Sequence, residues 1–266
     1  MLVDRALVAR IESFFARDAA GYALALAEVE PDSGAEVAEC AGGSIVYMGP
    51  GMHVNRAIGV GVAQPARAAD VDVIADFFAT RDCDAEIELC PYADDAVRAR
   101  AAELGFRLDW FRNVYTLALT LRHPPSFPSS EVEFIPVDAS NFASWAGMWA
   151  EQSRDADVER RFARARHAKS GEHDFVAAID GGPVAVCSLS IGDGFADLGG
   201  MLTREPWRGR GIQAACIAHR LAFAARSGCD LAVTSATPGT ASARNIERAG
   251  FQAIYTSVGL RRTTSR

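Results

Sequence analysis

The chain has 266 residues, of which 49% are hydrophobic and 23% charged, and this composition predicts a folded protein with one large core or two of ordinary size. Its net charge of −7 excludes a protein that binds nucleic acid through a general excess of basic residues. Residues 1–122 carry 11 arginines against 19 acidic residues, so the acidic excess lies in the first half.

Several kinds of localisation and site are also disfavoured. Asp4 and Glu12 interrupt the N-terminal apolar pattern, which a secretory signal would not allow. No apolar run approaches the ~18 residues of a membrane helix. The six cysteines show no C-x-x-C spacing and the five histidines no ligand spacing. We therefore expect a cytoplasmic protein with reduced thiols, no bound metal and no membrane partner.

The first half alternates helical and strand patterns. An N-terminal helix is expected, with Leu7, Ile11 and Phe14 on one face. The pattern then predicts a hairpin of strands 35–40 and 44–48 around a turn at 41–43, a glycine-bearing strand 56–62, a helix 67–80, a strand 85–89, a helix 94–103, and, after Leu104-Gly105-Phe106, a strand through Leu121.

A proline- and serine-rich segment, HPPSFPSS at 123–130, follows and predicts a linker. The second half then predicts strand 131–137, helices 139–153 and 154–170, strands 174–180, 183–191 and 195–203 joined by turns at 181–182 and 192–194, helix 212–226 ending before Gly228, strand 231–237, a short helix capped by Ser242 and ending before Gly250, and strand 251–260.

The two halves carry one pattern twice, most directly where AAELGF in the first half matches IERAGF in the second. We predict two α/β domains, 1–122 and 131–266, each with a mixed, mostly antiparallel sheet flanked by helices. Gly59 to Phe106 spans 47 residues, whereas Gly199 to Phe251 spans 52. The surplus falls at TREPWRGRGIQ, residues 203–213, so this loop is peculiar to the second copy.

A glycine-rich turn that leads into a helix favours a phosphate site, because free backbone N–H groups gather there at the positive end of the helix dipole. A nucleoside triphosphate loop is excluded, since the segment has no lysine. Residues 209–214 satisfy a dinucleotide fingerprint, and Asp230 lies 21 residues after Gly209. Three features disfavour a dinucleotide site. Residues 204–207 separate the strand from the helix, which a dinucleotide-binding turn joins tightly, and Asp230 precedes the next strand instead of ending it. The strands before the loop are linked by hairpins, so they are antiparallel.

The sequence resembles the GNAT superfamily of N-acetyltransferases, over residues 131–260 and, as a degenerate copy without the loop, over 36–121. The resemblance is carried by Arg208-Gly209-Arg210-Gly211-Ile212, by Ser242 and Asn245 in Ser-x-x-Asn spacing, and by Gly250-Phe251. Gln213 departs from the family, which usually has glycine or alanine there. The resemblance implies two GNAT-like domains, of which the second binds acetyl-CoA and the first shapes the acceptor site or supports the sheet.

The resemblance also implies how the coenzyme is held. The pyrophosphate would lie on the backbone N–H groups of residues 208–213, with added positive charge from Arg208 and Arg210, and pantetheine would lie along the preceding strand. The implied coenzyme-binding residues are Met201, Leu202, Thr203, Arg208, Gly209, Arg210, Gly211, Ile212, Gln213 and Asn245.

Many members of the family carry a tyrosine that protonates the leaving thiolate, and at that position this sequence has Ile246. Tyr255 is our substitute for that acid. The candidate bases are Glu151, Asp193, Asp197 or a chain of water molecules, and His53 of the first copy is a further loop candidate.

We predict direct transfer of an acetyl group to a primary amine of a small-molecule or peptide acceptor, by a monomer or homodimer. The alternative is a non-catalytic acyl-CoA-binding or regulatory module.

Overall fold

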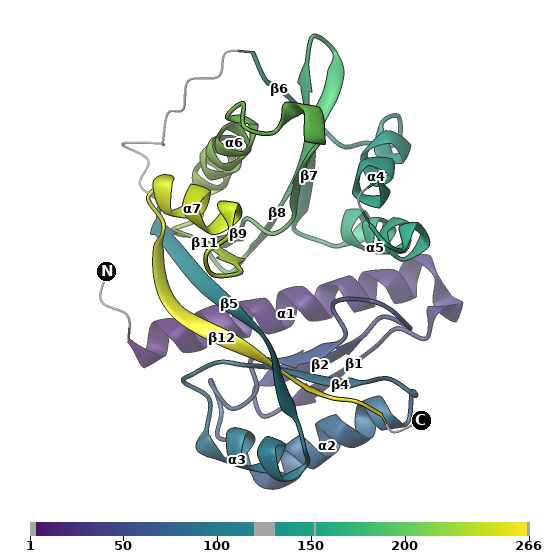
Figure 1. Ribbon diagram of the computed structural model, residues 1–266, viewed down its shortest axis with the longest axis vertical. Coiled ribbons are helices and arrows are strands. Elements are labelled where there is room, and N and C mark those ends of the chain that lie inside the picture. Colours follow the sequence, from purple (N-terminus) through teal and green to yellow (C-terminus); the bar gives the residue numbers. More distant parts are fainter. Residues whose placement is uncertain (1–3, 120–130, 152, 265–266) are drawn as a thin grey trace. The chain divides into compact units, whose positions relative to one another are not determined.

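The computed structural model describes residues 4–119, 131–151 and 153–264 (Figure 1). The chain forms two compact units, the first from Met1–Val114 with Ile254–Arg266 and the second from Tyr115–Ala253. The boundaries fall inside two long strands, β5 (Arg107–Ala118) and β12 (Gln252–Arg262). The predicted linker 123–130 lies outside the described residues.

The first unit has a mixed sheet in the order β1-β2-β3-β4-β12. Only β3 and β4 are parallel, and the other neighbours are antiparallel. The elements follow the predicted order: α1 (Arg5–Val29), a 3₁₀ turn (Pro31–Ser33), β1 (Glu36–Cys40), β2 (Gly43–Tyr47), β3 (Arg56–Ile58), α2 (Ala68–Ala79), β4 (Ala85–Leu89), α3 (Asp95–Glu103) and β5. The strand expected at 56–62 ends at Ile58, because Gly59 and Gly61 adopt φ values of +75° and +73°.

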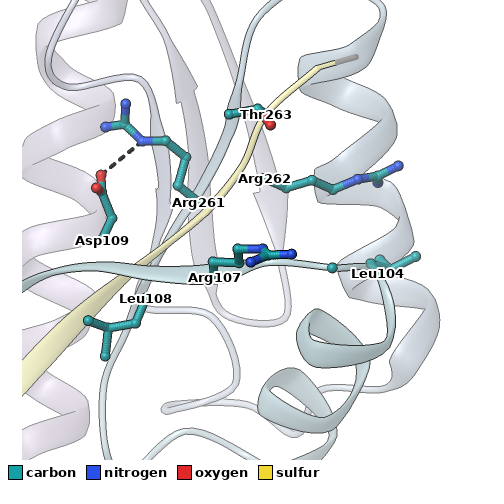
Figure 2. A pocket seen from close by; sticks show the side chains of 8 residues that line it. Leu104, Arg107, Leu108, Asp109, Arg261, Arg262 and Thr263 are labelled. Atoms are coloured by element: carbon teal, nitrogen blue, oxygen red, sulfur yellow. Dashed lines mark ion pairs between the residues drawn. The ribbon is translucent and has the colours of Figure 1, made fainter.

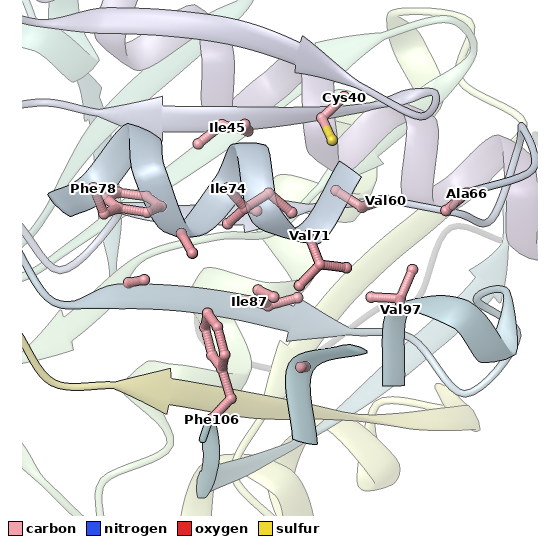
Figure 3. Packing of buried hydrophobic residues seen from close by; sticks show 14 of the residues in the cluster. Cys40, Ile45, Val60, Ala66, Val71, Ile74, Phe78, Ile87, Val97 and Phe106 are labelled. Carbon is pink, nitrogen blue, oxygen red and sulfur yellow. The ribbon is translucent and has the colours of Figure 1, made fainter. Parts of the chain in front are cut away.

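The first unit's core lies between its sheet and helices α2 and α3 (Figure 3). Val71, Ile74 and Phe78 recur at helical spacing on α2 and are fully buried against Ile87 of β4. Phe106, of the repeated Gly-Phe pair, belongs to the same cluster. The repeated motif therefore supplies a core residue directly after α3.

The second unit contains β6 (Glu133–Pro136), α4 (Phe142–Ala150), α5 (Ala156–Ala168), β7 (Glu172–Ile179), β8 (Gly182–Gly192), β9 (Phe195–Asp197), β10 (Met201–Thr203), a 3₁₀ turn (Glu205–Trp207), α6 (Ile212–Arg226), β11 (Leu231–Ala236) and α7 (Ala241–Arg248). Its sheet runs β5-β11-β9-β8-β7-β6, and β10 pairs with β8. Both units are thus mixed, mostly antiparallel α/β domains, as the sequence predicts.

The hairpins β1–β2, β7–β8 and β8–β9 share one turn geometry. Both central residues have positive φ in Ala41-Gly42, Asp180-Gly181 and Asp193-Gly194, as a type I′ turn requires. The turn predicted at 181–182 is therefore displaced by one residue, and Gly182 already begins β8. The cap predicted at Ser242 is wrong: Thr240 caps α7, and its Oγ1 accepts from the N–H of Ala243 at 3.2 Å.

The long strand that closes each sequence repeat is divided between the two compact units. β5 follows the first copy's Gly-Phe pair, yet its end lies beside β11 in the second unit's sheet. β12 follows the second copy's pair, yet Val258–Arg262 pairs with Ala85–Leu89 of β4 in the first unit. The limits 1–122 and 131–266 follow the repeat in the sequence, whereas the boundaries of the compact units fall inside β5 and β12.

Candidate functional site

The glycine–arginine loop joins β10 to α6 in the second unit. Gly209 and Gly211 have φ values of +75° and +79°, which strain any residue with a side chain. A Cβ built on either glycine would meet no atom within 4 Å. Both glycines are therefore required by backbone conformation, and both face open space.

Unpartnered N–H groups gather at the start of α6. In the described part of the chain, the backbone N–H groups of residues 209–213 donate to no protein acceptor. No side chain caps this helix, and its first turn contains no acidic residue. The N–H of Arg208 differs from the expectation, because it donates to the carbonyl of Glu205 at 3.1 Å. The cradle thus comprises residues 209–213, at a helix end that attracts anions.

The two loop arginines also fix the loop to its own surroundings. Nε of Arg208 donates to the carbonyl of Thr203 at 3.2 Å, which ties the loop to the end of β10. The guanidinium of Arg210 lies 4.9 Å from the ring centre of Trp207, a cation–π distance. Both side chains are exposed beside the cradle.

The equivalent helix of the first unit is closed to an anion. Asp70, in the first turn of α2, accepts a 2.7 Å hydrogen bond from the N–H of Arg67 and places a negative charge at the helix end. A Cβ on Gly61 would lie 3.0 Å from both Ala66 and Val97. The first unit therefore lacks both the open space and the free positive helix end.

Gln213 joins the two helices that carry the family-like motifs. Nδ2 of Asn245, on α7, donates to Oε1 of Gln213 at 2.6 Å, and Nε2 of Gln213 lies 3.4 Å from Oγ of Ser242. The unusual glutamine is thus the partner of the Ser-x-x-Asn pair. This contact fixes the start of α6 relative to α7.

A double-mutant cycle of Gln213→Ala and Asn245→Ala should show this link. Each variant removes the same hydrogen bond, so we expect a coupling of about 1 kcal/mol in the free energy of unfolding. Urea unfolding of the four proteins measures it. Strictly additive effects would contradict the link.

The strand before the loop is interrupted by a bulge. The strand expected at 195–203 is two strands, β9 and β10, separated by Gly200 with φ of +70°. β9 lies between β8 and β11, but β10 pairs with β8 alone. The sheet therefore opens between β10 and β11, and within the described residues no strand pairs with the edge of β10 that faces away from β8.

A cavity of about 190 Å³ lies at this opening. It is bounded by the bulge at Gly200, by Met201 of β10, by Thr234 of β11 and by both helices. Gln213, Ser242 and Ile246 also line it, so the cavity includes the link between the helices. Of the predicted coenzyme-binding residues, Met201 and Gln213 contact the cavity, and Asn245 adjoins it through Gln213.

Sequence reasoning missed Arg220, which also lines the cavity and is only 2% exposed. The available signal was its position on α6, where it continues the buried stripe of Ile212 and Cys216 at four-residue steps. An arginine on such an apolar face has to be held by polar partners.

A buried polar cluster on α5, β7 and β8 was also missed. Asp174, 7% exposed, accepts a 2.6 Å hydrogen bond from Oγ of Ser188, which in turn accepts from Arg166 at 3.1 Å. Burial raises the pKa of Asp174. A Cβ on Gly200 would lie 2.1 Å from Nη1 of Arg166, so the cluster adjoins the bulge.

None of the predicted bases lines the cavity. Glu151 forms an ion pair with Arg204 at 2.5 Å, and Asp193 occupies the β8–β9 turn. Asp197, at the end of β9, lies next to Gly199. His53 is an exposed residue between β2 and β3 of the first unit.

Tyr255 belongs to the first unit and does not line the cavity. Its ring is 8% exposed, and its hydroxyl donates to Oε1 of Glu12 at 2.5 Å. Burial, followed by the charge of Glu12, raises the pKa of Tyr255. These contacts give the hydroxyl a structural role in the core of the first unit. The role of Tyr255 as an acid stays a prediction.

Tyr255→Phe separates the two roles. If the hydroxyl serves packing, the variant loses about 1–2 kcal/mol of unfolding free energy and keeps its turnover number. Thermal unfolding and steady-state kinetics measure both. A drop of tenfold or more in turnover at unchanged stability would instead support the acid.

The first unit has a larger but open pocket of about 430 Å³ (Figure 2). Arg107, Arg261 and Arg262 surround it, and all three are exposed. Arg261 is already paired with Asp109 at 2.9 Å and with Glu86 at 2.8 Å. Its described lining contains neither a glycine loop nor the first residues of a helix, so it differs from the cavity beside β10.

Within the described residues, no group of three or more His, Cys, Asp and Glu side chains could hold a metal ion. Within them, too, every helix is too short or too polar to cross a membrane.

A model of the acetyltransferase (GNAT) family matches residues 139–251. The matched segment contains the loop, the cavity and the link between α6 and α7. No curated protein matches the chain.

Several solved structures resemble the chain. A GCN5-related N-acetyltransferase from Kribbella flavida is 20% identical, with a TM-score of 0.65 over 94% of this chain and 96% of that one. A tandem GNAT protein from the clavulanic acid biosynthesis pathway is 14% identical, with a TM-score of 0.54 over 83% and 74% of the two chains. A functionally unknown conserved protein from Staphylococcus epidermidis is 13% identical, with a TM-score of 0.58 over 74% and 79%. At these identities the likeness establishes the fold.

Proposed function

Since residues 139–251 form a domain of the GNAT acetyltransferase family, we propose that this protein transfers the acetyl group of acetyl-CoA directly to a primary amine. The family assignment supports acyl-CoA-dependent acetyl transfer in general. The specific reaction, the donor and the kind of acceptor are our proposal.

The observation that carries the proposal is the cradle of free N–H groups at residues 209–213. A pyrophosphate is a double anion with several acceptor oxygens, so it suits convergent N–H donors at a positive helix end. Arg208 and Arg210 would add charge for the remaining phosphate. Valine or any larger residue at Gly209 or Gly211 would occupy the space that the phosphate oxygens need.

The opening between β10 and β11 suits the rest of the coenzyme. Pantetheine is a chain with two amide groups, and it could lie as an added strand along the edge of β10 that faces away from β8. Met201, Leu202 and Thr203 would provide those contacts, with Asn245 held nearby by Gln213. The thioester would then lie in the 190 Å³ cavity, with a backbone N–H near Leu202 as the donor to its carbonyl oxygen.

The reaction needs two reactants in one complex and a neutral amine. The acceptor ammonium loses its proton, the amine nitrogen attacks the thioester carbon, and the carbon–sulfur bond breaks. We propose a small-molecule or peptide acceptor and no nucleic acid, membrane or metal partner. The six free cysteines accord with a cytoplasmic location. We further propose a monomer or homodimer in which the first unit supports the sheet or the acceptor site.

A thiol-release assay with acetyl-CoA and a mixed panel of amines tests the proposal. We expect amine-dependent release of CoA that rises with pH from about 7 to about 9, as more acceptor becomes neutral. The second candidate, a non-catalytic acyl-CoA-binding module, is favoured by Ile246, which lines the cavity and cannot donate a proton. Tight CoA binding without turnover on any amine would support that candidate.

A further inference from the structure

Arg220 places a buried positive charge in the wall of the coenzyme cavity. Its side chain is 2% exposed and lies on the buried face of α6. Among the cavity-lining residues that the structure describes, it is the one that carries a charge.

The guanidinium is held in place by neutral acceptors. Nε donates to the carbonyl of Cys216 at 3.2 Å, and Nη1 contacts the carbonyls of Ser188 and Leu198 at 3.0 Å and of Gly200 at 3.4 Å. In the described part of the chain, no carboxylate pairs with it. The carbonyl groups on both sides of the bulge thus fix the cation, and its charge stays uncompensated.

One nitrogen of Arg220 lacks a strong acceptor. Nη2 contacts the sulfur of Met201 at 3.7 Å, and a thioether is a weak acceptor. Met201 begins the strand along which pantetheine would lie. The remaining N–H capacity of Arg220 is therefore next to the place proposed for the thioester.

Ile246 lines the same cavity at the position where family resemblance implies a proton-donating tyrosine. An aliphatic side chain can neither protonate nor hydrogen-bond a leaving sulfur. A thiol has an ordinary pKa of about 8.5, so a nearby cation can keep it ionised near neutral pH.

We propose that Arg220 is a catalytic residue that stabilises the CoA thiolate as the leaving group; this rests on the proposed function. The acceptor nitrogen forms its bond to the carbonyl carbon, and the carbon–sulfur bond breaks with its electron pair staying on sulfur. Nη2 of Arg220 donates a charge-assisted hydrogen bond to that sulfur. The proton of the new amide nitrogen leaves to solvent, and no side chain has to protonate the sulfur.

The first test uses the wild-type protein. CoA and desulfo-CoA, which lacks the sulfur, are titrated calorimetrically from about pH 6 to about pH 9, and thiolate absorbance is followed in parallel. We expect the bound thiol to have a lower pKa than free CoA, so the preference for CoA over desulfo-CoA should grow about tenfold across this range. An equal or higher pKa for the bound thiol would overturn the proposal.

The second test uses variants of similar length. Arg220→Met should lower the turnover number by about 100-fold, abolish the pH-dependent preference for CoA, and leave desulfo-CoA affinity within about threefold. Arg220→Lys should retain part of the preference. Arg226→Met, at the exposed end of α6, is the matched control and should behave as wild type.

The outcomes separate this inference from the function on which it rests. Unchanged turnover and unchanged pH dependence in Arg220→Met would overturn the role of Arg220. Should Arg220→Met fail to fold, the wild-type titration still decides. If wild-type protein binds neither CoA nor desulfo-CoA, the proposed function itself is wrong.

Discussion

Gly211→Val is expected to abolish CoA binding while leaving the protein folded. Gly211 has a φ of +79° at the first position before α6, and the space around its Cα is open. A valine there places two methyl groups where the pyrophosphate would approach the N–H groups. The backbone strain costs about 1–2 kcal/mol, which a domain of this size tolerates.

The rise in melting temperature on adding CoA measures this effect, because a ligand that binds only the folded state stabilises it by mass action. Wild-type protein should show a clear rise and Gly211→Val none. Gly228→Val is the matched control, since Gly228 has a φ of +80° in open space at the other end of α6. An unchanged CoA response in Gly211→Val would refute the assignment of the loop.

The second large effect concerns Glu12, a carboxyl group buried in the first unit. Glu12 lies on α1, is 1% exposed, and accepts the hydrogen bond of Tyr255. Burial and then the charge of Glu88 raise its pKa from 4.5 to about 7, although Tyr255 and Arg112 oppose the rise. The folded protein therefore holds a proton on Glu12 over a range in which the unfolded chain has released it.

This difference makes stability fall as pH rises. The raised pKa contributes stability that is fully present below about pH 4.5 and is lost as pH passes about 7. The loss amounts to about 3 kcal/mol, from the roughly 2.5-unit difference between the two pKa values. The side chain of Glu12→Gln stays neutral at every pH, so the unfolding free energy of this variant should lack this dependence on pH.

Urea unfolding of wild type and Glu12→Gln at about pH 5 and about pH 8 measures the difference. We expect Glu12→Gln to gain stability relative to wild type by about 2.5 kcal/mol between these conditions. Glu28→Gln changes an exposed carboxylate of the same helix and serves as the control. Parallel pH profiles for wild type and Glu12→Gln would contradict this account of Glu12.

Much of the fold could be predicted because its signals are local. Hydrophobic spacing gave the helices, glycine-containing turns gave the hairpins, and the repeated Gly-Phe pair revealed the two copies. The loop at 208–213 was recognisable because positive φ values restrict Gly209 and Gly211 to one residue type.

The places where β5 and β12 pass from one compact unit to the other could not be predicted in this way. The partner of a strand can lie far away in the sequence, as β4 does for β12, so a local pattern does not identify it. Tyr255 was predicted as the acid for the leaving thiolate, and the structure adds that its hydroxyl donates to Glu12 in the first unit.

The site residues that sequence reasoning missed depend on contacts between distant segments. Gln213 departs from the glycine or alanine that is usual in the family, and its bond to Asn245, 32 positions away, gives it a role. Arg220 acquires its partners only when the bulge around Gly200 exposes carbonyl groups to α6. A local sequence pattern contains neither the Gln213–Asn245 bond nor the partners of Arg220.

Calorimetric titration of the wild-type protein with CoA and, separately, with NAD tests the central claim most directly. Both ligands carry a pyrophosphate, so the comparison asks whether the cradle at residues 209–213 and the opening beside β10 together select the pantetheine-bearing molecule. We predict saturable binding of CoA and none of NAD. Tight binding of NAD without binding of CoA would contradict the account.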